Sequence, residues 1–139
     1  MALLVLAGCG GEEGGGTRSN TGAGEHDEHG GSAKARFSSS EATTVVRTTL
    51  RDFAFDGVSP SVKGPKVFFE ATNQGPSSHE LVVADEDGRE VGAIPPFDRG
   101  LTKTLAVELE PGRYTTRCVV RLGNRTHAQL GMETSFTVE

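Results

Sequence analysis

The sequence predicts an all-β protein, a Greek-key β-sandwich preceded by a disordered N-terminal tether. Beyond residue 42, short runs of alternating apolar and polar residues recur between glycine and proline turns. Seven or so such runs, with no segment of convincing helical periodicity, are typical of a sandwich. The preceding residues are dominated by Gly, Ser, Glu and Thr, and they bury too little apolar surface to offset the entropy of ordering.

The expected strands follow one another along this second part of the chain. Val46, Thr48 and Leu50 alternate with polar residues, which predicts a strand with one buried face, and Phe53 and Phe55 are expected to continue it. The other expected strands are residues 66–72, 79–84, 102–109, 113–120 and 134–138. Turns are expected at residues 73–76, 85–88 and 111–112, residues 92–100 are expected to be irregular, and a long loop is expected before the last strand.

The N-terminal segment carries a processing signal. Leu6-Ala7-Gly8-Cys9 matches the bacterial lipobox, in which Cys9 becomes the lipid-modified first residue of the mature protein. No basic residue precedes Cys9, so we interpret residues 1–9 as a partial signal peptide. Residues 10–42 are then a flexible linker and residues 43–139 a folded domain. The alternative is a short apolar N-terminus with an incidental cysteine.

These features predict a location outside the cytoplasm, periplasmic or on the outer face, with a lipid anchor as the contact with the membrane. No apolar run is long enough to span a bilayer. The net charge is −5, with three basic and five acidic residues up to Ser40 and eleven and fourteen beyond it. Neither part is basic, so nothing points to nucleic acid.

Four residues of the domain have the chemistry of a copper site. His79, Cys118, His127 and Met132 supply two imidazoles, a thiolate and a thioether, the ligand set of a mononuclear blue-copper centre. The soft sulfur ligands favour Cu(I), imidazole serves both oxidation states, and Met132 is expected to be the weak axial ligand. If Cys9 is acylated, Cys118 has no disulfide partner within the chain, which in an exported protein indicates metal binding or reactivity.

Strand phase is expected to bring two of these residues to the core. His79 shares a face with Leu81 and Val83, and Cys118 shares a face with Thr116, because side chains two apart on a strand point the same way. His127 and Met132 follow on the loop, where they are expected to close the site. The alternative for Cys118 alone is a small core residue.

From about Thr44 to Glu139 the chain resembles the cupredoxins, the superfamily of plastocyanin and azurin. The marks of this resemblance are Asp52-Phe53-Ala54-Phe55, Asn73-Gln74-Gly75 before His79, Leu109 to Tyr114 before Cys118, and Gly131-Met132. The resemblance implies a β-sandwich with one copper ion near one end, held by His79, Cys118, His127 and Met132. The Cys-x8-His-x4-Met spacing is similar to that of the type 1 site in copper nitrite reductases, and its Cys–His interval is longer than in plastocyanins.

One position departs from the family pattern. Small blue-copper proteins usually have Asn directly after the first His, where it braces the cysteine loop, and here Glu80 follows His79. Asn124 or Asn73 is a candidate substitute. In the linker, His26 and His29 with three neighbouring acids are a second possible metal feature, and the alternative there is a polar tether without metal.

The function predicted is that of a membrane-tethered type 1 copper protein that carries single electrons between redox partner proteins and transforms no small-molecule substrate. The alternatives are a copper-handling protein, which stores or donates the ion, and a cupredoxin-like binding module without metal. An enzyme such as a nitrite reductase needs a second copper centre, and no His remains in the domain beyond His79 and His127. Arg121 and Arg125 flank the ligand loop and are a candidate docking point for an acidic partner.

Overall fold

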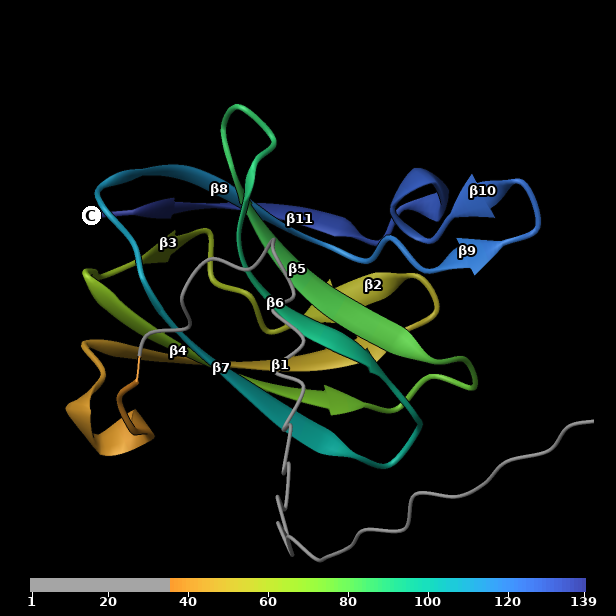
Figure 1. Ribbon diagram of the computed structural model, residues 1–139, viewed down its shortest axis with the longest axis horizontal. Coiled ribbons are helices and arrows are strands. Elements are labelled where there is room, and N and C mark those ends of the chain that lie inside the picture. The colour runs from red at the N-terminus through yellow and green to blue at the C-terminus, as the bar shows by residue number, and fades with distance from the viewer. Residues whose placement is uncertain (1–35) are drawn as a thin grey trace, which may run out of the picture.

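In the computed structural model, which describes residues 36–139, the strands assemble into two main sheets (Figure 1). The four-stranded sheet has the order β2-β1-β4-β7, made of β2 (Ala54–Asp56), β1 (Thr44–Arg51), β4 (Lys66–Asn73) and β7 (Thr102–Glu108). The five-stranded sheet has the order β3-β11-β8-β5-β6, made of β3 (Ser61–Val62), β11 (Glu133–Val138), β8 (Gly112–Arg117), β5 (His79–Asp85) and β6 (Glu90–Phe97). The prediction of an all-β sandwich is confirmed.

Most neighbouring strands are antiparallel, but β1 pairs with β4 in parallel, as β3 does with β11. The alternation predicted for β1 is observed, since Val46, Thr48 and Leu50 are buried and Arg47 is exposed. The rings of Phe69 on β4 and Phe136 on β11 meet edge to face, with centroids 6.0 Å apart. This contact joins the two sheets, and both rings belong to the apolar core.

Two expectations about strands were wrong. Residues 92–100 are not irregular throughout, because β6 extends to Phe97 and includes Pro95 and Pro96. β6 is an edge strand, so prolines that lack an N–H are tolerated in it. The first strand also does not continue through Phe53 to Phe55. The chain turns after Arg51 and returns as β2, antiparallel to β1, which leaves Phe55 beside Leu50.

The long loop expected before the last strand is partly ordered as a small hairpin, and β8 ends at Arg117, short of the expected residue 120. β9 (Arg121–Leu122) pairs with β10 (Arg125–Thr126) and is followed by the 3₁₀ helix η2 (Ala128–Leu130). Gly123 in the two-residue turn has φ of 62°, a value that glycine adopts without strain. We call residues 119–131 the β9–β10 lobe. It projects from the sandwich at the end opposite the C-terminal residue (Figure 1).

Before β1 the described chain contains one short 3₁₀ helix, η1 (Ser39–Glu41), in which the Glu41 carboxylate accepts hydrogen bonds from the N–H and hydroxyl of Ser38. The lipobox with Cys9, most of the predicted linker and the pair His26 and His29 lie outside the described residues. Within residues 36–139, no helix has the length and apolar character needed to cross a membrane.

Candidate metal centre

The predicted ligands meet at the end of the sandwich from which the β9–β10 lobe projects. Cys118 follows the last residue of β8, and His79 is the first residue of β5. His127 and Met132 bracket η2. All four residues are buried, with exposed fractions of 2 % or less. The structure therefore brings residues far apart in the sequence into one interior region.

Three donor atoms form a close triangle. The Nδ1 atoms of His79 and His127 are 3.1 Å apart, and the Sγ atom of Cys118 lies 3.5 Å from Nδ1 of His127 and 3.9 Å from Nδ1 of His79. Among the described residues, these three make the one group of His, Cys and acidic side chains whose donor atoms converge within 4.8 Å. No other part of residues 36–139 offers a comparable cluster.

The triangle has the dimensions of a trigonal metal plane. With metal–nitrogen and metal–sulfur bonds of about 2.0 and 2.3 Å, such a plane separates two nitrogens by about 3.5 Å and nitrogen from sulfur by about 3.7 Å. The observed separations, 3.1, 3.5 and 3.9 Å, lie within a few tenths of an ångström of these values. Two imidazoles with one thiolate are the in-plane donor set of blue-copper sites. The residues present therefore fit a copper ion.

The loop before His79 is fixed by Asn73, the last residue of β4. The Nδ2 group of Asn73 donates to the carbonyl oxygens of Ser77 and Phe97, both at 2.9 Å, and its Oδ1 atom accepts from the N–H of Gly75. Asn73 is fully buried, and all of these polar atoms are satisfied. Asn73 therefore braces the loop that leads to His79, and it does not brace the cysteine loop.

Glu80 braces the cysteine loop itself. Its backbone N–H points to Sγ of Cys118 at 3.5 Å, and its carboxylate accepts from the N–H of Val119 at 2.9 Å. The interpretation of Asn124 as a substitute brace was wrong, because Asn124 is exposed in the turn of the β9–β10 hairpin. The glutamate side chain has the length and the acceptor oxygen to reach across from β5.

Backbone hydrogen bonds hold the lobe over the site. The carbonyl oxygen of Met132 accepts from the N–H of Cys118 at 3.1 Å, and the N–H of Met132 donates to the carbonyl of His127 at 2.9 Å. The carbonyl of Cys118 accepts from the N–H of Ala128 at 2.7 Å. These bonds tie Cys118, His127 and Met132 together through the main chain. The axial role of Met132 stays a prediction.

Burial shifts the pKa values of two of the predicted ligands, Cys118 and His127. Burial raises the pKa of the Cys118 thiol, and the negative charges of Glu80 and Asp52 raise it further, against hydrogen bonds from two backbone N–H groups. Burial lowers the pKa of His127, and His79 lowers it further, although the charge of Asp52 opposes this. A neutral imidazole has a free lone pair for a metal, and a bound cation would favour the thiolate.

Sequence reasoning missed two contacts of this site. Asp52, in the turn between β1 and β2, lies with Oδ1 at 2.5 Å from Nε2 of His79. In the sequence, Asp52 belongs to a stretch that resembles the cupredoxins, but no local pattern connects it to a histidine 27 positions away. Phe53, its neighbour, packs edge to face on the ring of His127, with centroids 5.0 Å apart.

Comparison with solved structures places this architecture among known folds. The chain superposes on the dithionite-reduced auracyanin of Roseiflexus castenholzii with a TM-score of 0.58 and 17 % identity, covering 70 % of this chain and 98 % of that one. For auracyanin B the TM-score is 0.62 at 17 % identity, covering 79 % of this chain and 96 % of that one. The chain has a cupredoxin fold.

A third similar structure is the azurin Az-iso2 of Methylomonas sp. strain J, with a TM-score of 0.51 and 14 % identity over 70 % of this chain and 98 % of that one. No protein-family model matches the chain, and no curated protein matches it. At these identities the likeness establishes the cupredoxin fold alone.

Proposed function

We propose that this chain is a type 1 copper protein, tethered to the membrane through Cys9, that carries single electrons between redox partner proteins outside the cytoplasm. The convergence of Nδ1 of His79, Nδ1 of His127 and Sγ of Cys118 on one buried point supports the proposal. Copper held there by His79, Cys118 and His127 would supply one-electron chemistry, which is what a carrier between a reduced and an oxidised partner protein requires. The proposed role includes no conversion of a small-molecule substrate.

The buried position of the donors favours electron transfer over copper handling. His79, Cys118 and His127 have exposed fractions of 0 to 2 %, so an incoming copper chaperone would have little direct access to them. Hydrogen bonds that involve Asn73, Glu80 and Met132 hold the surrounding loops in place. A rigid site changes its geometry little when the oxidation state changes, which is the requirement of an electron carrier.

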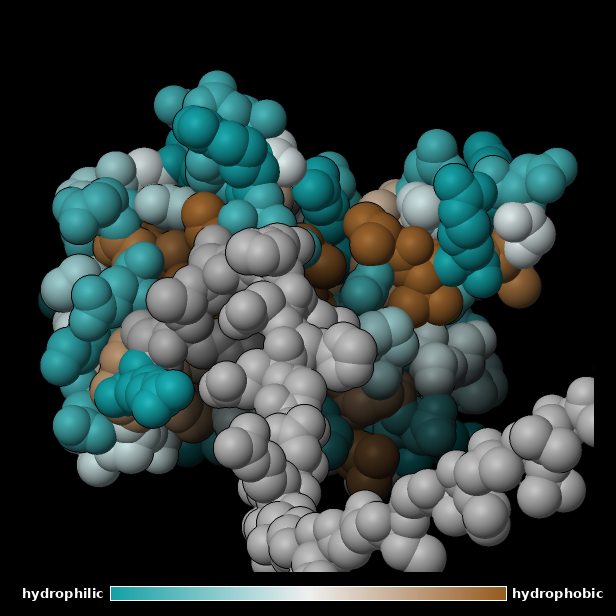
Figure 2. Space-filling model, in the orientation of Figure 1, coloured by the Kyte–Doolittle hydropathy of each residue, from teal (hydrophilic) through white to brown (hydrophobic). Residues whose placement is uncertain are grey.

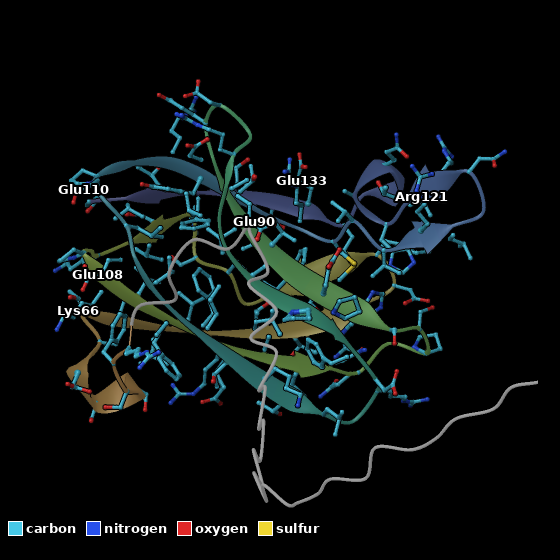
Figure 3. The ribbon with its side chains drawn as sticks, viewed as in Figure 1. Lys66, Glu90, Glu108, Glu110, Arg121 and Glu133 are labelled. Atoms are coloured by element: carbon cyan, nitrogen blue, oxygen red, sulfur yellow. The ribbon has the colours of Figure 1, made fainter. Side chains whose placement is uncertain are left out.

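The β9–β10 lobe is the proposed docking surface. Val119 and Leu122 are large apolar residues with exposed fractions of 43 % and 57 %. Arg121 and Arg125 are exposed on the paired strands, and no acidic residue occurs between Glu110 and Glu133. Figure 2 shows hydrophobic surface beside this lobe, and Figure 3 labels Arg121 on it. This combination is complementary to an acidic partner surface with an apolar centre.

The experiment that tests the metal site is Cu(II) loading of the chain, followed by visible and electron paramagnetic resonance spectra. We expect an intense visible band from thiolate-to-copper charge transfer and narrow copper hyperfine splitting. A protein that binds copper without this band would favour the copper-handling alternative. A protein that binds neither Cu(II) nor Cu(I), with Cys118 a free thiol, would leave a cupredoxin-like binding module.

A further inference from the structure

Both oxygens of the Asp52 carboxylate are engaged at the back of the candidate site. Oδ1 contacts Nε2 of His79 at 2.5 Å, and Oδ2 accepts a hydrogen bond from the hydroxyl of Ser77 at 3.1 Å. The His79 side chain is fully buried, and that of Asp52 is 24 % exposed. The carboxylate therefore contacts the ring nitrogen that does not face Cys118 and His127.

This contact determines which nitrogen of His79 carries the proton. A carboxylate oxygen accepts hydrogen bonds and donates none, so Nε2 of His79 must be the donor. A neutral imidazole has one N–H, so Nδ1 then keeps a free lone pair. That lone pair faces Nδ1 of His127 and Sγ of Cys118, where a metal would lie. The contact at Nε2 thus leaves the lone pair of Nδ1, on the other side of the ring, free to bind a metal.

Gly75 provides the space for this contact. A Cβ atom at position 75 would lie 2.6 Å from Nε2 of His79 and 2.9 Å from Oδ1 of Asp52, closer than real Cβ atoms approach other atoms. Gly75 has no left-handed backbone conformation that would itself require glycine. The absence of a side chain at this position is therefore explained by the pairing of Asp52 with His79.

We propose that Asp52 is a positioning residue for the metal centre: it holds His79 through Nε2, directs Nδ1 to the metal, and adds a negative charge that stabilises Cu(II) relative to Cu(I). The proposal rests on the proposed copper site. Carboxylates bonded to the far nitrogen of a metal-binding histidine fix the ring and make it a stronger donor. A negative charge beside the ligand also favours the more positive oxidation state, so the reduction potential falls.

The positioning role can be tested in the metal-free protein by ¹⁵N nuclear magnetic resonance of the histidine side chains. We expect His79 of the wild type as the tautomer protonated at Nε2. Asp52→Ala should redistribute that proton between the two nitrogens. Asp52→Asn keeps an acceptor oxygen and should largely preserve the tautomer. A wild-type His79 protonated at Nδ1, or an Asp52→Ala variant with unchanged His79 signals, would overturn the role.

The electrostatic role requires copper-loaded protein and a matched control. Asp98→Asn removes the same charge at the same end of the molecule, where Asp98 accepts from the hydroxyl of Ser78 at 2.6 Å. Asp52→Asn should weaken Cu(II) binding by about 10- to 100-fold. Cu(I) binding should weaken less, so the dissociation constant for Cu(II) divided by that for Cu(I) should rise about tenfold. This rise corresponds to an increase of about 59 mV in the reduction potential. Asp98→Asn should leave this ratio nearly unchanged.

If Asp52→Asn and Asp98→Asn change the ratio of the two dissociation constants equally, the electrostatic role of Asp52 is overturned. Any negative charge near this end of the molecule would then have the same effect. Failure of the copper site itself would appear differently, as a wild type that binds no copper. That result would overturn both the proposed function and the effect of Asp52 on the reduction potential. The nuclear magnetic resonance experiment on the metal-free protein would still decide whether Asp52 holds His79.

Gly75→Ala provides an independent variant, expected to change the His79 tautomer and to weaken Cu(II) binding in the same direction as Asp52→Ala. Gly112→Ala is its control, since a Cβ there would meet no atom closer than 3.7 Å. If Gly75→Ala does not fold, the two Asp52 variants still decide the proposal. A folded Gly75→Ala protein that matches the wild type in tautomer and in Cu(II) affinity would contradict it.

Discussion

The carboxylate of Glu80 accepts a hydrogen bond from the backbone N–H of Val119 at 2.9 Å, and this bond joins the start of β5 to the β9–β10 lobe. The same residue donates its own N–H to Sγ of Cys118. Burial raises the pKa of the Glu80 carboxyl, and the hydrogen bond from Val119 opposes that shift. The Glu80 side chain thus connects the strand that begins with His79 to the lobe that carries His127.

Glu80→Ala should lower the free energy of unfolding of the metal-free protein by about 1–2 kcal/mol, because the N–H of Val119 loses its acceptor. Glu80→Gln should cost less, since the amide oxygen can still accept. Denaturant unfolding of the two variants and the wild type measures the difference. Identical midpoints for Glu80→Ala and the wild type would show that the brace adds nothing to stability.

Cys118→Ser should abolish the intense visible band of the copper-loaded protein, because that band requires a thiolate bonded to copper. The hydroxyl is close in size to the thiol, so the fold should persist. Circular dichroism provides the control for folding and the visible spectrum the test. A variant that is as intensely coloured as the wild type would exclude Cys118 as a ligand.

Met132→Leu should leave copper bound but raise the reduction potential, because the weak axial thioether is lost while the in-plane donors remain. A shift of about 59 mV corresponds to a tenfold change in the preference for Cu(I) over Cu(II). Leu and Met have similar volumes, so the buried position should remain filled. Voltammetry measures the potential, and an unchanged value together with an unchanged spectrum would exclude Met132 as the axial ligand.

Arg121→Gln combined with Arg125→Gln should slow oxidation of the reduced copper protein by the anion hexacyanoferrate(III), because two positive charges that attract the anion are removed. The difference in rate from the wild type should decrease as salt is added, since salt screens this attraction. We expect a several-fold decrease at low ionic strength. Oxidation by a cationic cobalt(III) phenanthroline complex should instead speed up.

The matched control for the lobe is Arg47→Gln combined with Arg113→Gln, which removes the same total charge from β1 and β8. If this control slows the reaction with hexacyanoferrate(III) as much as the lobe variant does, net charge alone is responsible, and the lobe is not the docking surface.

Cys9→Ala should release the protein from the membrane fraction of bacterial cells, because the lipobox cysteine is the proposed site of lipid attachment. Fractionation followed by immunodetection measures the distribution. Cys118→Ser is the matched control, since it also removes one cysteine and should stay with the membrane. A Cys9→Ala protein that remains in the membrane fraction would contradict lipid anchoring.

Local pattern was sufficient for much of the fold. The alternation of Val46, Thr48 and Leu50 predicts which face of β1 is buried, because side chains on a strand point to opposite faces in turn. Pro95 and Pro96 misled the prediction for β6, since proline excludes a central strand but not an edge strand. Edge position is a property of the sheet order, which no local pattern contains.

The sequence by itself determined the chemical identity of the candidate site, since the donor types and the interval from Cys118 to Met132 can be seen in the chain. Only the tertiary structure decided what surrounds it. Asp52 lies 27 positions before His79, and Glu80 lies 39 positions before Val119. These contacts exist only because β1 and β8 end, and β5 begins, at the same end of the sandwich. Spacing along a chain specifies which groups are available, and packing determines which of them touch.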